Sequence, residues 1–305
     1  MKLYVGVDIG GTHTKIAAVE LNGGVVARLQ VETKDSIANT EKKVNYWLDS
    51  LRSNLEELDT PKNQNVEAVG VAAPGLVAAD ERSIAHMPGR LAGLEQLDWQ
   101  EELNRNAPVP VINDAQAALL AEAWIGVAKN ISNAVLLTLG TGVGGALMLH
   151  DEVFSGALGR AGHLGHISLD IDGSPDICGM PGSLESLVGQ ETLSARSRGR
   201  YISYDQLMQD YKDGDPHATE IWLRSVKALA TGIASIINII DPEVVLLGGG
   251  ISASDELVQP LTDFMRYVEW RPYGNAVPIR VAQLGAYGGA IGAARKAMLA
   301  CNIKN

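Results

Sequence analysis

Two glycine-rich turns in this sequence carry the residue types that bind phosphate. The first, Gly10-Gly11, lies between two β-branched apolar runs, so residues 5–19 are predicted to form a β-hairpin. Asp8 precedes the turn, and three hydrogen-bond donors follow it: Thr12, Thr14 and Lys15. Glycine N–H groups approach an anion closely because no Cβ intervenes. Asp8 could hold a hydrated Mg²⁺ beside the phosphates.

The second glycine-rich turn repeats this pattern within residues 135–149. Strand-like apolar residues again flank a turn, and its candidate phosphate-binding residues are Gly140, Thr141, Gly142 and Gly144. A single turn of this kind is a weak motif that fits an ordinary hairpin as well. Two copies about one domain length apart predict two related lobes that face each other across a nucleotide.

Asp114 is the candidate catalytic base. It lies where a predicted strand gives way to an alanine-rich helix, the position at which α/β folds bind ligands. A carboxylate there could accept the proton of a hydroxyl that attacks a terminal phosphate. The alternative is that Asn113 or Asp114 only caps the helix. The two phosphate-binding turns favour the base, because a phosphate donor implies an acceptor.

Two further glycine runs have two interpretations each. Gly248-Gly249-Gly250 follows a buried strand, where the backbone suits a flat ring such as adenine or simply turns. Residues 285–290 permit close packing of the last helix, either at a hinge or without motion.

The elements that must position these residues alternate between strands and helices, which predicts an α/β fold. Helices are identified by apolar residues at helical spacing and strands by β-branched runs. The predicted strands, besides the two hairpins, cover residues 25–31, 66–73, 109–112, 244–247 and 279–282. The predicted helices cover residues 42–58, 115–124 and 218–240, with a last helix that ends at residue 299. Residues 79–93 and 155–189 are predicted loops.

The composition is that of a soluble globular protein long enough for two domains: 305 residues, 46% hydrophobic and 20% charged. The net charge of −11 disfavours a nucleic acid or an anionic membrane as partner. The longest apolar stretch, residues 228–251, contains polar residues and Pro242, which predicts a buried helix, a turn and a buried strand. With only Cys178 and Cys301 and no signal-peptide pattern, we expect a cytoplasmic protein.

Five segments occur in an order and spacing that resemble the ROK family of bacterial sugar kinases: Asp8–Thr12, Asn113-Asp114, Leu139–Gly145, Gly162–His166 and Val245–Gly250. The resemblance covers nearly the whole chain. It implies an actin-like ATPase fold, in which two ribonuclease-H-like lobes enclose a nucleotide and a sugar. We expect a small lobe of residues 1–113 plus 291–305 and a large lobe of residues 114–290.

The resemblance also implies an activity, a partner and an assembly. The activity is ATP- and Mg²⁺-dependent transfer of a phosphoryl group to a hexose or hexose derivative, usually at the 6-hydroxyl. The expected partners are a small-molecule sugar and a second copy of the chain. Repressors of this family carry a DNA-binding segment before the first glycine-rich turn, which here begins within ten residues. We therefore expect no nucleic-acid partner.

The roles that the resemblance implies fall into three sets. Asp114 is the base, and Asn113 holds sugar hydroxyls beside it. The phosphate and adenosine contacts are Gly10, Gly11, Thr12, Lys15, Gly140, Thr141, Gly142, Gly144, Gly248 and Gly249. The other candidate sugar contacts are His163, His166, Glu185 and Arg90, although Arg90 could be a surface arginine.

One stretch departs from the family pattern. Family members usually have Glu-x-Gly-His and then Cys-x-Cys-Gly-x-x-Gly-Cys-x-Glu, whose His and three Cys hold a structural zinc. Here His163 replaces the glutamate, and Asp176 and Ser183 replace two cysteines. Because serine is a poor zinc ligand, we expect no zinc; a site built from His163, His166, Asp176 and Cys178 is the alternative.

The change at residue 163 also bears on the substrate. Imidazole donates one hydrogen bond and accepts one, whereas a carboxylate only accepts. The hydroxyls recognised near C1 and C2 of the sugar should therefore differ from those of a typical glucokinase; the alternative is that His163 points into the interior of its loop and the sugar is unchanged. A non-catalytic sugar-binding sensor of the same fold is the alternative function.

Overall fold

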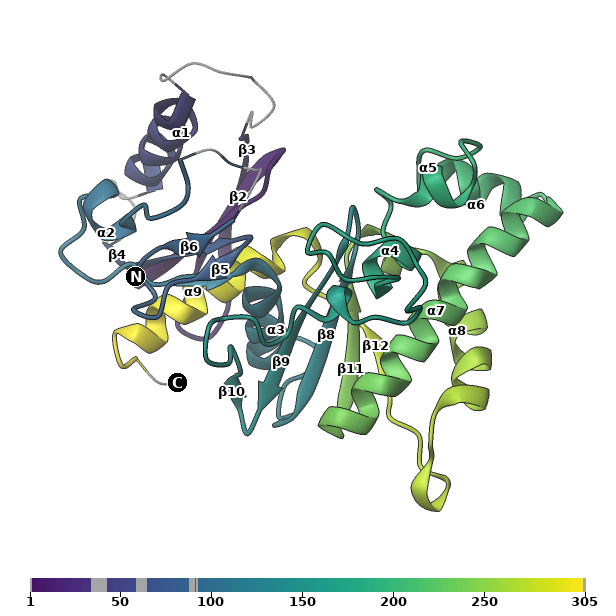
Figure 1. Ribbon diagram of the computed structural model, residues 1–305. Coiled ribbons are helices and arrows are strands. Elements are labelled where there is room, and N and C mark those ends of the chain that lie inside the picture. The colour runs from purple at the N-terminus through teal and green to yellow at the C-terminus, as the bar shows by residue number, and fades with distance from the viewer. Residues whose placement is uncertain (1, 34–42, 59–64, 88–90, 92, 304–305) are drawn as a thin grey trace. The chain divides into compact units, whose positions relative to one another are not determined.

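The computed structural model describes residues 2–33, 43–58, 65–87, 91 and 93–303, and it separates into two compact units (Figure 1). The first unit contains Met1–Asn130, Ser155–Ala161 and Gln283–Asn305. The second contains Ile131–Phe154 and Gly162–Ala282. The units therefore divide after Asn130 rather than after residue 113, because helices α3 (Asp114–Ile125) and α9 (Gly288–Ala300) pack against each other within the first unit.

The first unit is built on a five-stranded sheet with the order β3-β2-β1-β4-β7. Its strands are β1 (Lys2–Ile9), β2 (His13–Val19), β3 (Val25–Glu32), β4 (Asn65–Ala73) and β7 (Val111–Asn113). The first three strands form an antiparallel meander, and β1, β4 and β7 run parallel. A short hairpin of β5 (Leu76–Val77) and β6 (Ile84–His86) and the helix α2 (Trp99–Glu102) complete the unit. Residues 79–93 thus contain a strand that the sequence did not predict.

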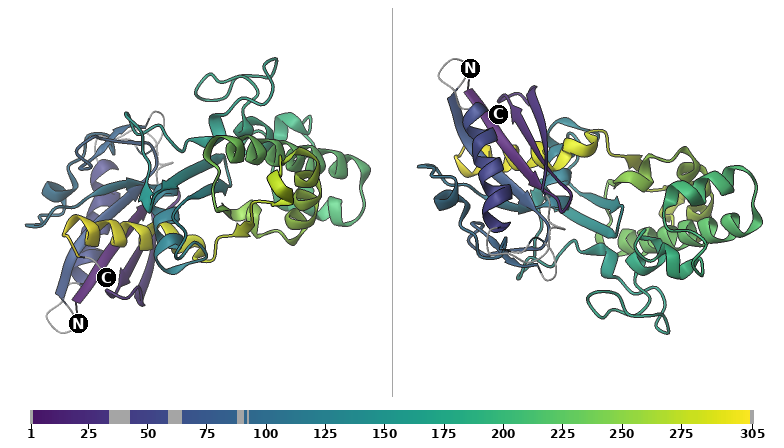
Figure 2. Two further views of the ribbon diagram at one scale, coloured as in Figure 1. Left: turned by 90° about the horizontal axis from the view of Figure 1, so that it is seen from below. Right: turned by 90° about the horizontal axis from the view of Figure 1, so that it is seen from above.

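Alternate residues of β1 face opposite sides of this sheet. Val5 and Val7 pack in a core with helix α1 (Lys43–Leu58), whereas Tyr4 packs with α9 on the other face (Figures 1 and 2). Gly6 lies so near α9 that a Cβ would overlap the Ala290 carbonyl, so helix and strand touch backbone to backbone. Asp8 has the same parity as Tyr4 and Gly6. It therefore lies on the face that α9 covers.

The second unit repeats the same strand plan in the order β10-β9-β8-β11-β12. Its strands are β8 (Ala134–Leu139), β9 (Val143–Leu149), β10 (Glu152–Val153), β11 (Val244–Gly248) and β12 (Ile279–Val281). In both sheets the third, second, first, fourth and fifth strands follow one another, and a glycine-rich turn joins the first to the second. The repeated hairpin in the sequence therefore corresponds to a repeated fold.

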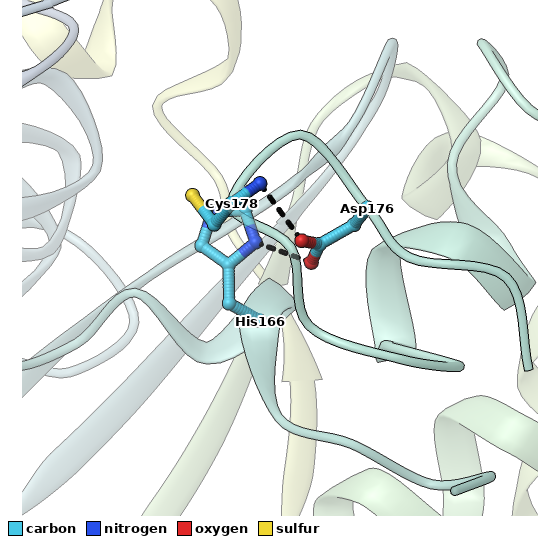
Figure 3. Close-up of side chains that lie close together, drawn as sticks. All are labelled: His166, Asp176 and Cys178. Atoms are coloured by element: carbon cyan, nitrogen blue, oxygen red, sulfur yellow. Dashed lines mark hydrogen bonds and ion pairs between the residues drawn. The ribbon is translucent and has the colours of Figure 1, made fainter. Parts of the chain in front are cut away.

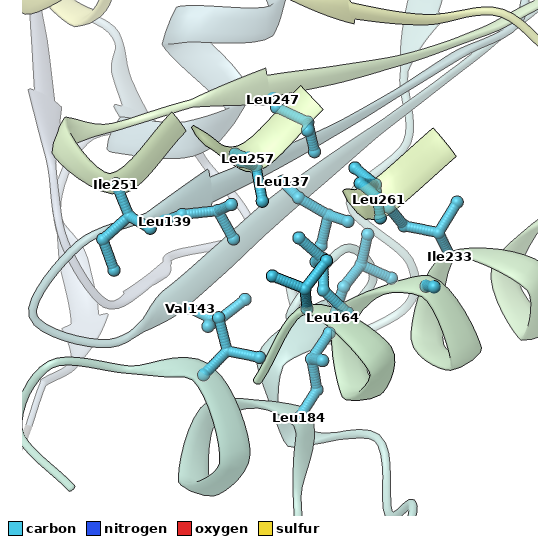
Figure 4. Packing of buried hydrophobic residues seen from close by; sticks show 14 of the residues in the cluster. Leu137, Leu139, Val143, Leu164, Leu184, Ile233, Leu247, Ile251, Leu257 and Leu261 are labelled. Carbon is cyan, nitrogen blue, oxygen red and sulfur yellow. The ribbon is translucent and has the colours of Figure 1, made fainter. Parts of the chain in front are cut away.

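Helices cover the sheet of the second unit and form its core. They are α4 (Leu184–Val188), α5 (Leu193–Arg196), α6 (Tyr204–Lys212), α7 (Pro216–Ile240) and α8 (Asp255–Val268). Leu137, Leu139 and Leu247 of the strands meet Ile233 of α7 and Leu261 of α8 (Figure 4). Burying each such side chain contributes roughly 1.5–3 kcal/mol. The loop between residues 167 and 183 extends away from this core (Figure 2).

Helix α7 accounts for the long apolar stretch of the sequence. By length and composition alone it is, among the described residues, a helix that could cross a membrane. Several of its apolar side chains, including Trp222, Val226 and Ile233, are buried in the core of the second unit, whereas Ile239 near its end is exposed. The helix ends at Asp241 in the left-handed conformation and β11 follows, so the predicted order of helix, turn and strand is confirmed.

Candidate active site

The first hairpin forms as predicted. Asp8 pairs across the two strands with Lys15, and the Gly10 N–H donates to the His13 carbonyl at 3.1 Å to close the turn. Gly11 and Thr12 are exposed at its tip. The Thr14 hydroxyl is buried and lies 2.8 Å from that of Thr33. Thr14 therefore stabilises the sheet instead of offering a donor to a ligand.

The Asp8 carboxylate lies against the first turn of α9. A Cβ at Gly289 would be 2.5 Å from Asp8 Oδ2, so this carboxylate occupies the space that a side chain at residue 289 would need. The N-terminal end of a helix carries partial positive charge, which favours an anion there. The glycine run at residues 285–290 was the sequence signal for this contact, but it identified close packing and not the partner.

Asp8 and Asp114 interact electrostatically within the first unit. Burial raises the pKa of Asp8 to about 7, the negative charge of Asp114 adds to the rise, and Lys15 acts against it. Two carboxylates held in this way leave negative charge that a divalent cation would neutralise. Carboxylate oxygens with space for water are the ligands that Mg²⁺ prefers, so these residues fit the ion.

Asn113 caps α3, and Asp114 begins it. Asn113 Oδ1 accepts the N–H groups of Ala115 at 3.0 Å and Gln116 at 3.3 Å, and its Nδ2 donates to the Gly75 carbonyl at 3.3 Å. The capping interpretation is therefore right for Asn113. Asp114 is exposed, and its Oδ1 accepts the Ala115 N–H at 2.8 Å. Its carboxylate is placed in the first helical turn, on the side of the unit that also holds Asp8.

The second hairpin is supported from the loop that follows it. The Gly140 N–H donates to the Gly142 carbonyl at 3.0 Å, and Gln190 and Glu191 donate to the turn carbonyls of Gly140 and Thr141. Glu185 Oε2 accepts the Val143 N–H at 2.9 Å, and a Cβ at Gly142 would overlap that oxygen. Glu185, a candidate sugar contact, thus holds the hairpin with one of its oxygens.

A cavity of about 280 Å³ adjoins this hairpin within the second unit. It is lined by Gly140, Thr141, Gln190, Tyr204, Asp205, Met208, Trp222, Gly250, Ile251 and Ser254. Gly249 has a φ of 86°, and a Cβ there would overlap the Leu139 carbonyl, so only glycine fits. Gly250 lines the cavity, whereas the predicted adenosine contacts Gly248 and Gly249 precede it in the chain and are not among the lining residues. No sequence pattern indicated the aromatic and polar residues that α6 and α7 contribute.

The loop between η1 (Leu164–His166) and α4 is organised by Asp176 (Figure 3). Its side chain is 2% exposed, and Oδ2 lies 2.7 Å from His166 Nδ1. Oδ1 accepts the N–H groups of Cys178 at 2.8 Å and Met180 at 3.0 Å. Burial acts to raise the pKa of Asp176, but the hydrogen bonds from His166 and from the loop outweigh it, so the pKa is lowered.

These residues do not fit a structural zinc site. His166, Asp176 and Cys178 place one ligand atom each within 4.8 Å of one another, whereas structural zinc takes four nitrogen or sulfur donors. Ser183 is fully buried; its Oγ accepts the Ser186 N–H and caps α4, and its side chain also hydrogen-bonds Asp176. The His163 ring is nearly parallel to that of His166, with centroids 6.4 Å apart. Arg90 lies outside the described residues.

Two α/β units with one strand order, each with a glycine-rich turn between its first two strands, define the duplicated fold of the actin-like ATPases. A sequence model of the ROK family matches residues 4–299, so the chain belongs to the ROK family.

Three relatives illustrate the similarity. The chain is 30% identical to a glucokinase from Halalkalibacterium halodurans, over 95% of this chain and 93% of that protein. It is 29% identical to an N-acetylmannosamine kinase from Haemophilus influenzae, over 95% and 93%. The crystal structure of a ROK family glucokinase from Streptomyces griseus, in complex with glucose and AMPPNP, superposes with a TM-score of 0.78 at 26% identity, covering 97% of this chain and 99% of that one.

Proposed function

We propose that this protein is an ATP-dependent kinase that phosphorylates the 6-hydroxyl of a hexose or hexose derivative, with Asp114 as the general base. The observation that carries the proposal is the pair of Asp8 and Asp114. One unit presents an exposed carboxylate at a helix start, close enough to a second, half-buried one to raise its pKa. Membership of a family whose named relatives are sugar kinases supports it.

The phosphates of ATP are held by backbone and hydroxyl donors of both hairpins. Gly11 and Thr12 at the first tip and Thr141 at the second are partly or fully exposed, and these turns present N–H groups to an anion. The same two hairpins contain the other candidate phosphate contacts, which are Gly10, Lys15, Gly140, Gly142 and Gly144. Lys15 stands beside Asp8 in the sheet register and adds positive charge on that side.

Adenosine occupies the cavity next to the second hairpin. The cavity volume of about 280 Å³ suits a nucleoside, and its lining begins at the hairpin residues Gly140 and Thr141. Trp222 lines it, and its Nε1 is buried with no hydrogen-bond partner among the described residues. Gly248 and Gly249 border the nucleoside from behind.

Asp8 would hold Mg²⁺ through water, and the ion would supply positive charge against the phosphate oxygens. Asp114 accepts the proton of the sugar hydroxyl as the hydroxyl oxygen attacks the terminal phosphorus. Water must be kept from attacking the phosphorus in place of the sugar. Closure of the two units therefore accompanies sugar binding.

The sugar contacts are Asn113, His163, His166, Glu185 and Arg90. Asn113 and Glu185 each use part of their side chain to hold the fold, so they offer the sugar only their remaining hydrogen-bonding capacity. His163 donates one hydrogen bond where a carboxylate would accept, so the preferred sugar differs from glucose near C1 or C2. We further propose a cytoplasmic homodimer without zinc.

A panel of sugars tests the proposal. ATP turnover is measured with Mg²⁺ and each of glucose, mannose, N-acetylmannosamine and N-acetylglucosamine, with product position established by NMR. We expect at least one sugar to stimulate ADP formation and to be phosphorylated at its 6-hydroxyl. Sugar binding without stimulation by any sugar would favour the sensor, and phosphorylation at another hydroxyl would refute the stated position.

A further inference from the structure

Glu122 is a buried carboxylate in α3 that the proposed chemistry does not use. The residue is 2% exposed and lies two turns beyond Asp114 on the same helix. Its Oε1 accepts the N–H groups of Gln283 at 2.7 Å and Leu284 at 2.8 Å. Its Oε2 accepts the Val127 N–H at 2.9 Å. Three backbone donors thus compensate one buried negative charge.

The segment that follows α3 is held by hydrogen bonds to Glu122. The N–H groups of Gly126 and Ala128 both donate to the Glu122 carbonyl oxygen, at 3.0 and 3.1 Å, while Val127 donates to the side chain. A Cβ at Gly126 would overlap Oε2, so the glycine leaves the space that the carboxylate fills. Glutamate at position 122 and glycine at position 126 therefore both suit this contact.

The two segments that Glu122 binds are those by which the chain first leaves the first unit and finally returns to it. The chain first passes to the second unit after Asn130, shortly beyond Ala128, and returns for the last time at Gln283; between these points it visits the first unit once, at Ser155–Ala161. One carboxylate thereby ties an outgoing and an incoming segment, more than 150 residues apart, to the same point of α3.

This point also joins α3, which carries Asp114, to α9, against which Asp8 lies. Asp114 begins α3, and Gly289, against which Asp8 lies, is in the first turn of α9. A Cβ at Gly292 would overlap the Ala117 carbonyl, so the two helices are in backbone contact. Glu122 fixes the chain just before α9, and hence the start of that helix relative to α3.

We propose that Glu122 is a positioning residue at the hinge of the first unit. It holds both connecting segments in place, so that the second unit moves about a fixed point while Asp8 and Asp114 keep their spacing. The inference rests on the proposed phosphoryl transfer, because Glu122 would guide the closure step of that reaction.

The experiment compares Glu122→Gln with a matched control, Glu269→Gln. The amide keeps the shape of Glu122 but turns one acceptor into a donor that meets a backbone N–H. Glu269 is also a buried glutamate, in the second unit; its Oε1 accepts the Val277 N–H at 2.7 Å and its Oε2 accepts from Arg271 at 2.8 Å. Both variants therefore lose comparable hydrogen bonds, but only one loses them at the passages between the units.

The readouts are kcat, the KM values for sugar and ATP, and Tm. We expect similar falls in Tm, but a fall in kcat of at least about tenfold for Glu122→Gln and less than about twofold for Glu269→Gln, since small misplacements of reacting groups are costly. Gly126→Ala, which displaces the same carboxylate from the other side, should reproduce the loss of kcat. Equal kcat in Glu122→Gln and Glu269→Gln, with an active wild-type enzyme, would overturn the inference.

Hydrogen exchange separates this outcome from failure of the proposed function. In the wild-type protein the amides of Gly126–Ala128, Gln283 and Leu284 should exchange slowly, with or without sugar and nucleotide. Fast exchange at these amides would overturn the hinge whatever the activity. Slow exchange in a protein that phosphorylates no sugar would refute the proposed kinase activity but would support the attachment of both segments to Glu122.

Discussion

The carboxylate of Asp8 fills the space that a side chain at Gly289 would need: a Cβ at residue 289 would lie 2.5 Å from Asp8 Oδ2. A residue near the beginning of the chain is thereby positioned by the first turn of the last helix. The contact places a negative charge at the positive end of α9 and sets its distance from Asp114.

Replacing Gly289 by alanine should displace Asp8. We expect kcat/KM for ATP to fall by roughly 10- to 100-fold, because a shift of about 1 Å in a catalytic group has costs of this order. Gly288→Ala is the matched control, since a Cβ there would meet its nearest neighbour at 3.7 Å. Equal activity of the two variants in steady-state assays would show that the Asp8 position does not depend on this glycine.

Removal of the Asp114 carboxylate should abolish the base without removing the nucleotide site. Asp114→Ala is expected to lower kcat by roughly 10²- to 10⁴-fold. ATP affinity, measured by calorimetry, should stay within a few-fold, because the cavity and the second hairpin belong to the other unit. An unchanged turnover number would refute the assignment.

The raised pKa of Asp8 predicts a pH dependence of stability in the absence of Mg²⁺. The native carboxyl titrates near 7 and the unfolded one near its ordinary value, so the native state holds the extra proton between these limits. The contribution of Asp8 to the free energy of unfolding is therefore fully present at low pH and is lost as the pH rises towards 7. Denaturant unfolding of the wild type and Asp8→Asn should show the wild type losing stability relative to the variant over this range.

The same experiment has an internal check in Asp114. Because the charge of Asp114 helps to raise the pKa of Asp8, Asp114→Asn should lower that pKa. Carboxyl resonances followed by NMR measure it directly. A pKa of Asp8 that does not move in the variant would mean that burial alone sets it.

Asp176 is expected to stabilise the loop between η1 and α4 without a metal ion. Its lowered pKa means that the stabilisation is present above the unfolded pKa and is lost as the pH falls through the folded one. Asp176→Ala should therefore expose residues 167–183 to protease at neutral pH, whereas Asp172→Ala, an exposed aspartate of the same loop, should not. One zinc ion per chain in untagged protein, detected by mass spectrometry, would contradict the metal-free arrangement.

The residues that the sequence identified within each hairpin were predictable because hairpin signals are local. Alternating apolar residues and a Gly-Gly or Gly-Thr-Gly turn lie within fifteen consecutive positions, and the structure confirms both hairpins and their repeated strand plan. Asn113 shows the limit of such reasoning. Cap and ligand contact use the same residue type at the same place, and the hydrogen bonds to Ala115 and Gln116 were needed to identify the cap.

The contacts that no pattern predicted join distant parts of the chain. Glu185 reaches Val143, Glu122 reaches Gln283, and Tyr204 and Trp222 meet across two helices beside the second hairpin. None of these pairs lies within one element, so periodicity and turn chemistry carry no information about them. Their partners depend on how the helices pack on the sheets.

The sequence by itself therefore determined the two hairpins, the α/β alternation and the family, because each depends on residue types at short spacings. The tertiary structure alone decided which carboxylates support the fold and which stay exposed for chemistry. Burial and hydrogen-bond partners make that distinction between Glu122, Glu185 and Asp114, and both arise only when segments far apart in the chain are brought together.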